Sequence, residues 1–397
     1  MMTNRRDFIK GSALATTSLF VPKFLRAFGG TSSSMPHKKL VVIQLSGGND
    51  GLNTVIPYAN DIYYRTRPGI GLQRQNLIAA SDVAAFNENL YDFTSMFDKG
   101  EVSILNSVGY PNPNRSHFRS MDIWQTGSDS DQYLNTGWIG RILDHNFQNA
   151  SNRNARAIEI NETLNLAMKG DAIKGLAMQS TKALHRITKH PYLQALSHHE
   201  EHRQQQADYL YKTLSATTES AHYLFEKTKT YRSKVSYPNN ILGKQLQQVA
   251  SLINADAVTQ IYYVSLSGFD THAGQRWKQG RLLKQYSKAV SAFVNDLKMG
   301  NRFDDTMIMT FSEFGRRVKQ NASGGTDHGA ANNLFLIGGK LKKPGFYNAM
   351  PDLSDLDDGD IKYQIDFRQV YATLIEKWLG YESKAILSKG FSLLDLY

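Results

Sequence analysis

Residues 305–329 read DTMIMTFSEFGRRVKQNASGGTDHG and hold the densest set of acid, base and ligand side chains in the chain. Their first seven residues are apolar and β-prone, which predicts a short buried strand. Glu313 and Arg316 emerge just past this strand, at the edge where open α/β sheets bind ligands. The glycine-rich loop that follows then returns Asp327 and His328. The stretch therefore predicts a functional site at the carboxyl end of a strand.

Other apolar or β-branched runs predict further strands, and ligand-bearing loops follow two of them. Asp50 follows the first run in SGGNDGLN, where glycines let the backbone approach a ligand closely. A hairpin turn is the alternative, because turn chemistry alone explains Asn-Asp-Gly. Asp270 and His272 lie two apart past another run, so both can face one side as oxygen and imidazole ligands. A helix cap with an incidental histidine is the alternative there. The strands are expected at 39–45, 101–108, 157–160, 166–170, 259–265, 306–311 and 334–338.

Residues 115–127 predict a helix that ends at Gly127 and has Ser116 or His117 in its first turn. A helix start concentrates free N–H groups and positive dipole, so a hydroxyl there is placed to act as a nucleophile or to hold an anion. Serine is also a preferred N-cap, and simple capping is the alternative role for Ser116.

Further helices are expected between the strands, and the length of 397 residues predicts one large α/β domain or two closely joined ones. A helical insertion is expected at about 181–255. It contains HHEEH at 198–202, but this segment is rich in glutamine and charge, which favours a solvated helix face over a metal site. The other helices are expected at 244–255, 281–299 and 366–380.

The first 30 residues read as an export signal. NRRDFIK at 4–10 precedes a mildly apolar stretch, an order that resembles a twin-arginine signal. An ordinary amphipathic helix is the alternative. We expect the Tat export machinery as a partner, a periplasmic or otherwise exported location, and a linker over 31–38 before the domain at 39–397.

Composition excludes several classes of function. The formal net charge is +10, but five basic residues against one acidic residue in 1–30 supply +4 of it, and the rest is scattered. Without a nucleic-acid-binding motif beside it, this charge does not predict nucleic-acid binding. The chain has no cysteine, which excludes disulfides, thiolate zinc sites and a cysteine nucleophile. No stretch after the signal has the length and apolarity of a membrane span, so we expect no stable span in the mature chain.

The strand-end carboxylates and histidines supply ligands for one or two divalent ions. These ligand types suit zinc, which we expect first, or calcium, magnesium or manganese. Asp327 is expected to orient a ligating histidine. Metal ions beside a helix-terminal hydroxyl suit displacement at phosphorus or sulfur, with Arg316, and also Arg115, as an anion clamp. The candidate metal residues are Asp50, Asp270, His272, Glu313, Asp327 and His328, and the candidate catalytic residues are Ser116, His117 and Arg316.

Six short motifs follow one another along the chain: GGNDGL at 47–52, SHF and WQTG within 116–127, DTH at 270–272, SEFGR at 312–316, TDHG at 326–329 and DFR at 366–368. In this order they resemble the DUF1501 family of exported bacterial proteins, from about residue 39 to the C-terminus. That resemblance implies a relation to the alkaline phosphatase and sulfatase superfamily, and so a three-layer α/β/α sandwich with a mostly parallel sheet. It implies that Asp50 is the first-strand ligand, that Asp270 and His272 are later ligands, and that His328 is the last.

The chain departs from the superfamily pattern at two places. It reads Glu313-Phe314 where Asp-His or Asp-Asn is common, which removes one ligand of a second metal. Counting back from WQTG at 124–127, the nucleophile position falls on His117, with Ser116 one residue earlier. The leading hypothesis is an exported metal-dependent hydrolase of a phosphate or sulfate ester, acting on a small anionic ester or an envelope polymer. The alternative, which Phe314 favours, is a non-catalytic metal-stabilised binding or accessory protein of the cell envelope.

Overall fold

The structure is a computed structural model that describes residues 38–150, 152–191, 193 and 205–397, and the side chains from 214 onward in the last range. The predicted export signal and the HHEEH segment at 198–202 lie outside the described residues. Residues 38–397 form one compact unit.

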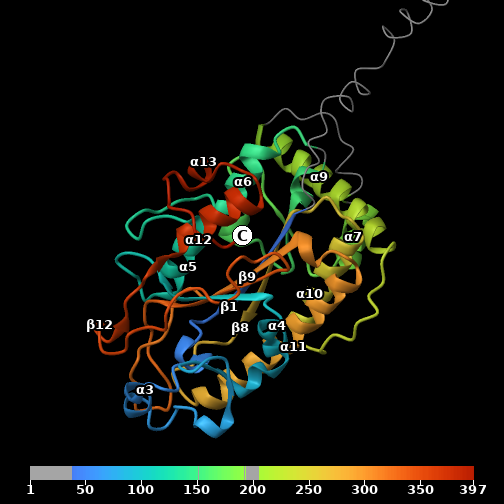
Figure 1. Cartoon of the computed structure of the whole chain (residues 1–397). Helices are drawn as coiled ribbons and strands as arrows, with labels where there is room; N and C mark the ends of the chain where they lie inside the picture. Colours follow the sequence, from blue (N-terminus) through green and yellow to red (C-terminus); the bar gives the residue numbers. More distant parts are fainter. Residues whose placement is uncertain (1–37, 151, 192, 194–204) are drawn as a thin grey trace, which may run out of the picture. The chain divides into compact units, whose positions relative to one another are not determined.

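A nine-stranded sheet forms the centre of this unit (Figure 1). Its order is β11-β5-β10-β9-β1-β8-β6-β7, with β14 beside β5. All neighbouring strands run parallel except β10, which is antiparallel to β5 and β9. The mostly parallel sheet is therefore confirmed. The strands are β1 (Lys39–Ser46), β5 (Val102–Gly109), β6 (Ala157–Glu159), β7 (Leu176–Ala177), β8 (Ile261–Ser267), β9 (Thr306–Phe311), β10 (Asn332–Ile337), β11 (Gly345–Phe346) and β14 (Ile365–Asp366).

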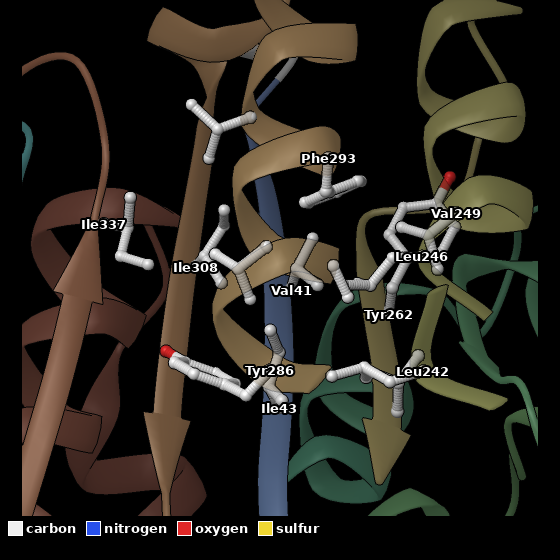
Figure 2. Close-up of a cluster of buried hydrophobic side chains, with 14 of the residues drawn as sticks. Val41, Ile43, Leu242, Leu246, Val249, Tyr262, Tyr286, Phe293, Ile308 and Ile337 are labelled. Carbon is white, nitrogen blue, oxygen red and sulfur yellow. The ribbon is translucent and has the colours of Figure 1, made fainter. Parts of the chain in front are cut away.

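Alternate side chains of the central strands enter two separate cores, one on each face of the sheet. Val41 and Ile43 of β1 pack in the first core, and Leu40 and Val42 pack in the second. Helices α4 (Tyr91–Asp98), α10 (Ile241–Asn254) and α11 (Gln275–Met299) cover the first face. Helices α5 (His117–Thr126), α6 (Trp138–Asn146) and α12 (Phe367–Thr373) cover the second. Figure 1 shows the helices on the two faces of the sheet, and Figure 2 shows part of the first core. The predicted three-layer α/β/α sandwich is confirmed.

The expected strand at 166–170 is wrong. Leu166–Met168 form a single 3-10 turn, and the Leu166 N–H donates to Oε1 of Gln125 in α5 instead of to a neighbouring strand. Ala167 and Met168 are buried, as in a strand, but a short turn buries two consecutive residues equally well. Of the predicted helical insertion, the described parts include α7 (Thr181–Thr188), α9 (Gln205–Thr228) and α10. No helix in the described part of the chain is long and apolar enough to cross a membrane.

The sheet order brings three loops together. Strands β9, β1 and β8 are adjacent and parallel, so their carboxyl ends lie at one edge of the sheet. The loops after them contain residues 47–53, 268–274 and 312–329, which include most of the predicted site. The start of α5, reached from β5, adds His117 to the same edge. Parallel topology thus positions the candidate centre described next.

Candidate metal centre

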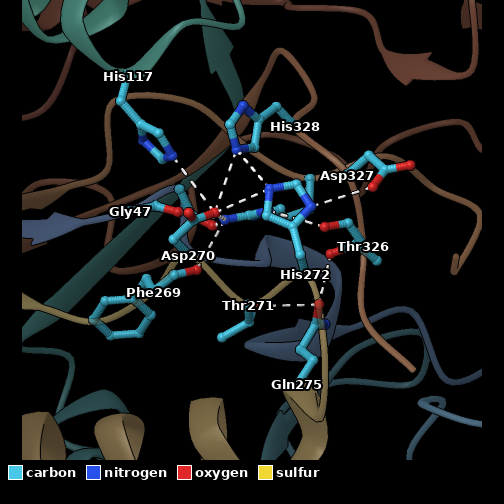
Figure 3. Close-up of polar contacts among 12 residues, drawn as sticks. Gly47, His117, Phe269, Asp270, Thr271, His272, Gln275, Thr326, Asp327 and His328 are labelled. Carbon is cyan, nitrogen blue, oxygen red and sulfur yellow. Dashed lines mark hydrogen bonds and ion pairs between the residues drawn. The ribbon is translucent and has the colours of Figure 1, made fainter. Parts of the chain in front are cut away.

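His117, Asp270 and His328 form the one group among the described residues that could hold a metal ion. One ligand atom from each lies within 4.8 Å of the others. His117 is the first residue of α5, Asp270 follows β8, and His328 lies in the loop between β9 and β10. Figure 3 shows the two rings and the carboxylate directed toward one point. Three elements that are far apart in sequence therefore build one centre.

His272 extends this group. Its Nε2 lies 3.1 Å from Oδ1 of Asp270 and 2.9 Å from Nε2 of His328. The Asp270 oxygen is also 3.3 Å from Nε2 of His328 and 3.5 Å from Nε2 of His117. We call His117, Asp270, His272 and His328 the ligand cluster.

Each histidine of the ligand cluster has an oxygen acceptor at its other ring nitrogen. Because a carbonyl or carboxylate oxygen accepts a hydrogen bond, each Nδ1 carries the proton and each neutral Nε2 is left with a lone pair. This is the outer arrangement that metal-binding histidines usually have. The pairs are His117 Nδ1 with Glu313 Oε1 at 3.0 Å, His272 Nδ1 with Asp327 Oδ1 at 3.2 Å, and His328 Nδ1 with the Arg115 carbonyl at 2.6 Å.

With these tautomers, the atoms that face one another in the ligand cluster are all hydrogen-bond acceptors. The three Nε2 lone pairs all lie within 3.5 Å of one Asp270 oxygen, and Nε2 of His117 is buried without a hydrogen-bond partner. The two lone pairs of His272 and His328, 2.9 Å apart, repel unless a cation or a proton lies between them. Three imidazoles with a carboxylate are a zinc-type donor set. The residues present therefore fit a divalent metal ion.

Electrostatics in the ligand cluster also suit a cation. Partial burial opposes ionisation of Asp270, but the hydrogen bond from Arg316 and its positive charge outweigh this effect and lower the pKa of the carboxyl to about 2. Burial lowers the pKa of His328 below its ordinary value. The hydrogen bond to Glu313 raises the pKa of His117, so a metal ion competes with a proton for Nε2 of this residue. At neutral pH Asp270 is thus ionised and His328 neutral, the forms that coordinate metal.

Asp50 is not brought to the ligand cluster. Its buried carboxylate accepts hydrogen bonds from Nη1 of Arg67 at 2.6 Å, from the Leu52 N–H at 3.1 Å and from Gln275. It also caps the 3-10 turn Gly51–Asn53. This network occupies both oxygens, so we leave Asp50 out of the ligand set. Arg67, which lies 17 residues away in sequence, was not among the predicted site residues.

Glu313 and Arg316 hold the loops around the centre. Glu313 accepts from the Gly47 N–H at 2.8 Å as well as from His117, so it orients a ligand. The Arg316 side chain is fully buried and donates to Asp270 at 2.9 Å and to four main-chain carbonyls, among them those of Gly48 and Thr326. A substrate anion cannot reach it. The anion-clamp role predicted for Arg316 is therefore not carried forward.

The region around α5 places the two candidate nucleophiles differently. Ser116 is the exposed N-cap residue, and its hydroxyl makes no capping hydrogen bond. His117 belongs to the ligand cluster instead, a role that the sequence motif did not indicate. The helix ends as predicted at Gly127, which has a left-handed φ of 69°. Arg115, the second predicted anion clamp, directs its side chain to Asp360, with Nη2 2.6 Å from Oδ2.

Phe314 fills one side of the centre. Its ring centroid lies 4.8 Å from that of His117 and 4.6 Å from that of His328. The ring also packs on Gly48, where an added Cβ would approach it to 2.2 Å. On this side of His117 and His328 the described residues thus place an aromatic ring and not a ligand.

A cleft of about 400 Å³ opens beside the ligand cluster. It gives a small organic group room next to the candidate metal ligands. Its lining residues are Ser46, Gly47, His117, Phe118, Met121, Ser267, Gly268, Asp270 and Glu313.

Comparisons with known proteins give distant structural similarities and one family match. The C-terminal periplasmic domain of EcEptC from Escherichia coli, in complex with Zn, is 11% identical over 78% of this chain and 74% of that chain, with a TM-score of 0.39. The lipoteichoic acid synthase LtaP from Listeria monocytogenes is 10% identical over 91% and 77%, with a TM-score of 0.35. The sulfatase PsFucS1 from Pseudoalteromonas sp. is 10% identical over 90% and 70%, with a TM-score of 0.39. No curated protein matches the sequence. The model of the family described as "Protein of unknown function (DUF1501)" matches residues 103–387, which is more than half of the chain, and the chain therefore belongs to the DUF1501 family.

Proposed function

We propose that this protein is an exported, metal-dependent hydrolase of a phosphate or sulfate ester. The observation that carries the proposal is the convergence of three imidazole lone pairs and the Asp270 carboxylate beside an open cleft. Such acceptors without a donor between them indicate a bound cation, and zinc is the ion that this donor set favours. Hydrolysis adds water across the bond between the ester oxygen and phosphorus or sulfur, and releases an alcohol and phosphate or sulfate.

In this proposal the ion provides the charge, and the protein's residues hold the ion and orient its ligands. A bound divalent ion supplies Lewis-acid polarisation of the ester and neutralises negative charge that develops on it. His117, Asp270, His272 and His328 hold that ion. Glu313, Asp327 and the Arg115 carbonyl keep the three rings in the tautomer that binds.

Ser116 stays our candidate nucleophile. Its hydroxyl is exposed, is not used as a helix cap and lies one residue before His117. Attack by this hydroxyl forms a bond from its oxygen to phosphorus or sulfur and expels the alcohol. Water then cleaves the new ester and restores the serine. If a water molecule attacks directly instead, Ser116→Ala retains activity.

A non-catalytic binding protein is the second candidate, and two observations favour it. Phe314 occupies the side of the centre where another ligand is expected. Arg316 is buried and donates its hydrogen bonds to main-chain carbonyls, so it does not bind a substrate anion. On this account the metal ion stabilises the loops or anchors a ligand, and no ester is cleaved.

The export part of the proposal rests on the twin-arginine pattern at 4–10. We propose a periplasmic or otherwise exported location and the Tat machinery as the export partner, with metal loaded before export because that pathway carries folded proteins. Cell fractionation tests the export pathway. It compares where the protein is found with its natural signal and with a signal that carries both Arg5→Lys and Arg6→Lys. Loss of export in the variant supports the pathway, and unchanged export contradicts it.

The enzymatic test combines metal content with turnover. Purified protein is analysed for bound metal and assayed with sulfate and phosphate esters, alongside Asp270→Ala and the control Asp98→Ala on the exposed side of α4. We expect about one equivalent of divalent metal, and ester hydrolysis that is lost with the metal in Asp270→Ala only. Metal that binds normally without turnover of any ester supports the binding protein instead.

A further inference from the structure

We propose that the cleft beside the ligand cluster takes a singly charged ester whose organic group presents an apolar or aromatic face. Sulfate monoesters and phosphodiesters share this chemistry. The inference rests on the proposed function and narrows its substrate, because a doubly charged phosphate monoester is disfavoured. It follows from three properties of the cleft: its apolar wall, its charge and its hydroxyl groups.

Helix α5 provides an apolar wall. Phe118 and Met121 both line the cleft, and their spacing of three residues puts them on one helix face. Phe118 is 87% exposed, more than any other large hydrophobic residue that the structure describes. Met121 is held in place, since its sulfur accepts from Nε2 of Gln44 at 2.6 Å and the Gln44 oxygen accepts from Tyr263 at 2.5 Å. A fixed wall with an exposed ring favours a ligand that covers it.

The charges around the cleft match one negative charge better than two. Among its described lining residues the charged groups are Asp270 and Glu313, and neither a lysine nor an arginine is present. Arg316, the nearest guanidinium, is buried and bound to main-chain carbonyls. A divalent ion (+2) and Arg316 (+1) offset Asp270, Glu313 and Asp327 (−3), so the loaded centre has no net positive charge to attract a dianion. A singly charged ligand can pair its one charge with the ion. A second negative charge on the ligand would face these carboxylates without an opposing cation.

Two hydroxyl groups complete the lining without adding charge. Ser46 ends β1 and Ser267 ends β8, and the two residues lie opposite each other in the parallel register. Serine hydroxyls donate and accept hydrogen bonds, so they can satisfy ester oxygens of a ligand that is only singly charged. The cleft thus combines an aromatic face, neutral polar groups and an acidic edge.

Inert analogues test this substrate class by binding, independently of turnover. Isothermal titration of the zinc-loaded protein at alkaline pH compares benzenesulfonate, methanesulfonate and phenylphosphonate, which carry one charge and a ring, one charge without a ring, and two charges with a ring. We expect benzenesulfonate to bind about tenfold or more tightly than either of the others. Phe118→Ala should reduce its affinity to that of methanesulfonate, whereas Tyr91→Ala, which removes an exposed ring on α4, should leave it unchanged.

Two outcomes overturn the inference. Unchanged benzenesulfonate binding in Phe118→Ala shows that the ring lies elsewhere, and tighter binding of phenylphosphonate shows that the centre prefers two charges. Either result leaves the hydrolase proposal standing, since a metal-dependent phosphate monoesterase would still cleave esters. Conversely, Phe118-dependent binding of benzenesulfonate by a protein that cleaves no ester supports the cleft assignment and contradicts the hydrolase.

Discussion

The main-chain carbonyl of Arg115 accepts a hydrogen bond from Nδ1 of His328 at 2.6 Å, while the Arg115 side chain is held by the buried carboxylate of Asp360 at 2.8 Å. Arg317 lies 3.7 Å from the same carboxylate. Asp360 therefore fixes the segment whose carbonyl orients a candidate metal ligand, although it touches no ligand itself. The hairpin β12 (Leu356–Asp357) and β13 (Asp360–Ile361) carries this aspartate.

Asp360→Asn should weaken metal binding without abolishing it. Loss of the charge loosens Arg115 and so the carbonyl that orients His328, and changes of this outer kind cost about tenfold to a hundredfold in metal affinity. Competition with a chelator measures the effect. Asp358→Asn is the matched control, because Asp358 is exposed and contacts Arg115 only at 3.4 Å. Equal affinities in both variants would show that the Arg115 segment is held without Asp360.

Asp50→Ala should destabilise the protein but leave its metal content unchanged. The substitution leaves Arg67 buried without its carboxylate partner, a loss that costs about 3–5 kcal/mol in the free energy of unfolding. Urea unfolding measures the stability, and elemental analysis of the folded fraction measures the metal. A folded variant that lacks metal would restore Asp50 as a ligand, as the family resemblance implied.

Stability at alkaline pH should reveal the buried amine of Lys39. Burial lowers the pKa of Lys39 from 10.5 to about 8, and Nζ donates to the carbonyls of Ala257 and Thr259. Between these two pH values the unfolded chain binds more protons than the folded protein, so the free energy of unfolding rises with pH. The slope reaches at most about 1.4 kcal/mol per pH unit.

The control for this effect is Lys39→Met, which removes the titrating group. Urea unfolding of both proteins from neutral pH to pH about 10 should show natural protein gaining stability relative to the variant across the window of the lowered pKa. A difference that stays constant with pH would mean that the amine keeps its ordinary pKa in the folded protein.

Much of the fold could be predicted because local patterns determine it. The runs at 39–45 and 306–311 became central strands, and Gly127 ended the helix that begins at His117. The turn at 166–170 was missed because two buried residues in a row do not distinguish a strand from a turn. The apolar run at 166–170 is too short for its periodicity to distinguish a strand from a turn.

The site could be predicted only in part, since polar residues at strand ends have several possible partners. Asp270, His272 and His328 do meet, as their positions after parallel strands suggested. The partner of Asp50 is Arg67, which no motif pointed to. The role of Arg316 depends on four carbonyls from three separate loops, and sequence spacing does not show such contacts.

The most direct test of the metal centre is X-ray absorption spectroscopy at the zinc edge of the purified, zinc-loaded protein. We predict one zinc ion with three imidazole nitrogens at about 2.0–2.1 Å and carboxylate oxygen in its coordination shell. His272→Gln should remove one imidazole, and His145→Gln, on α6 and outside the ligand cluster, should remove none. A spectrum with no imidazole, or one unchanged by His272→Gln, would contradict the assignment of this cluster as a metal centre.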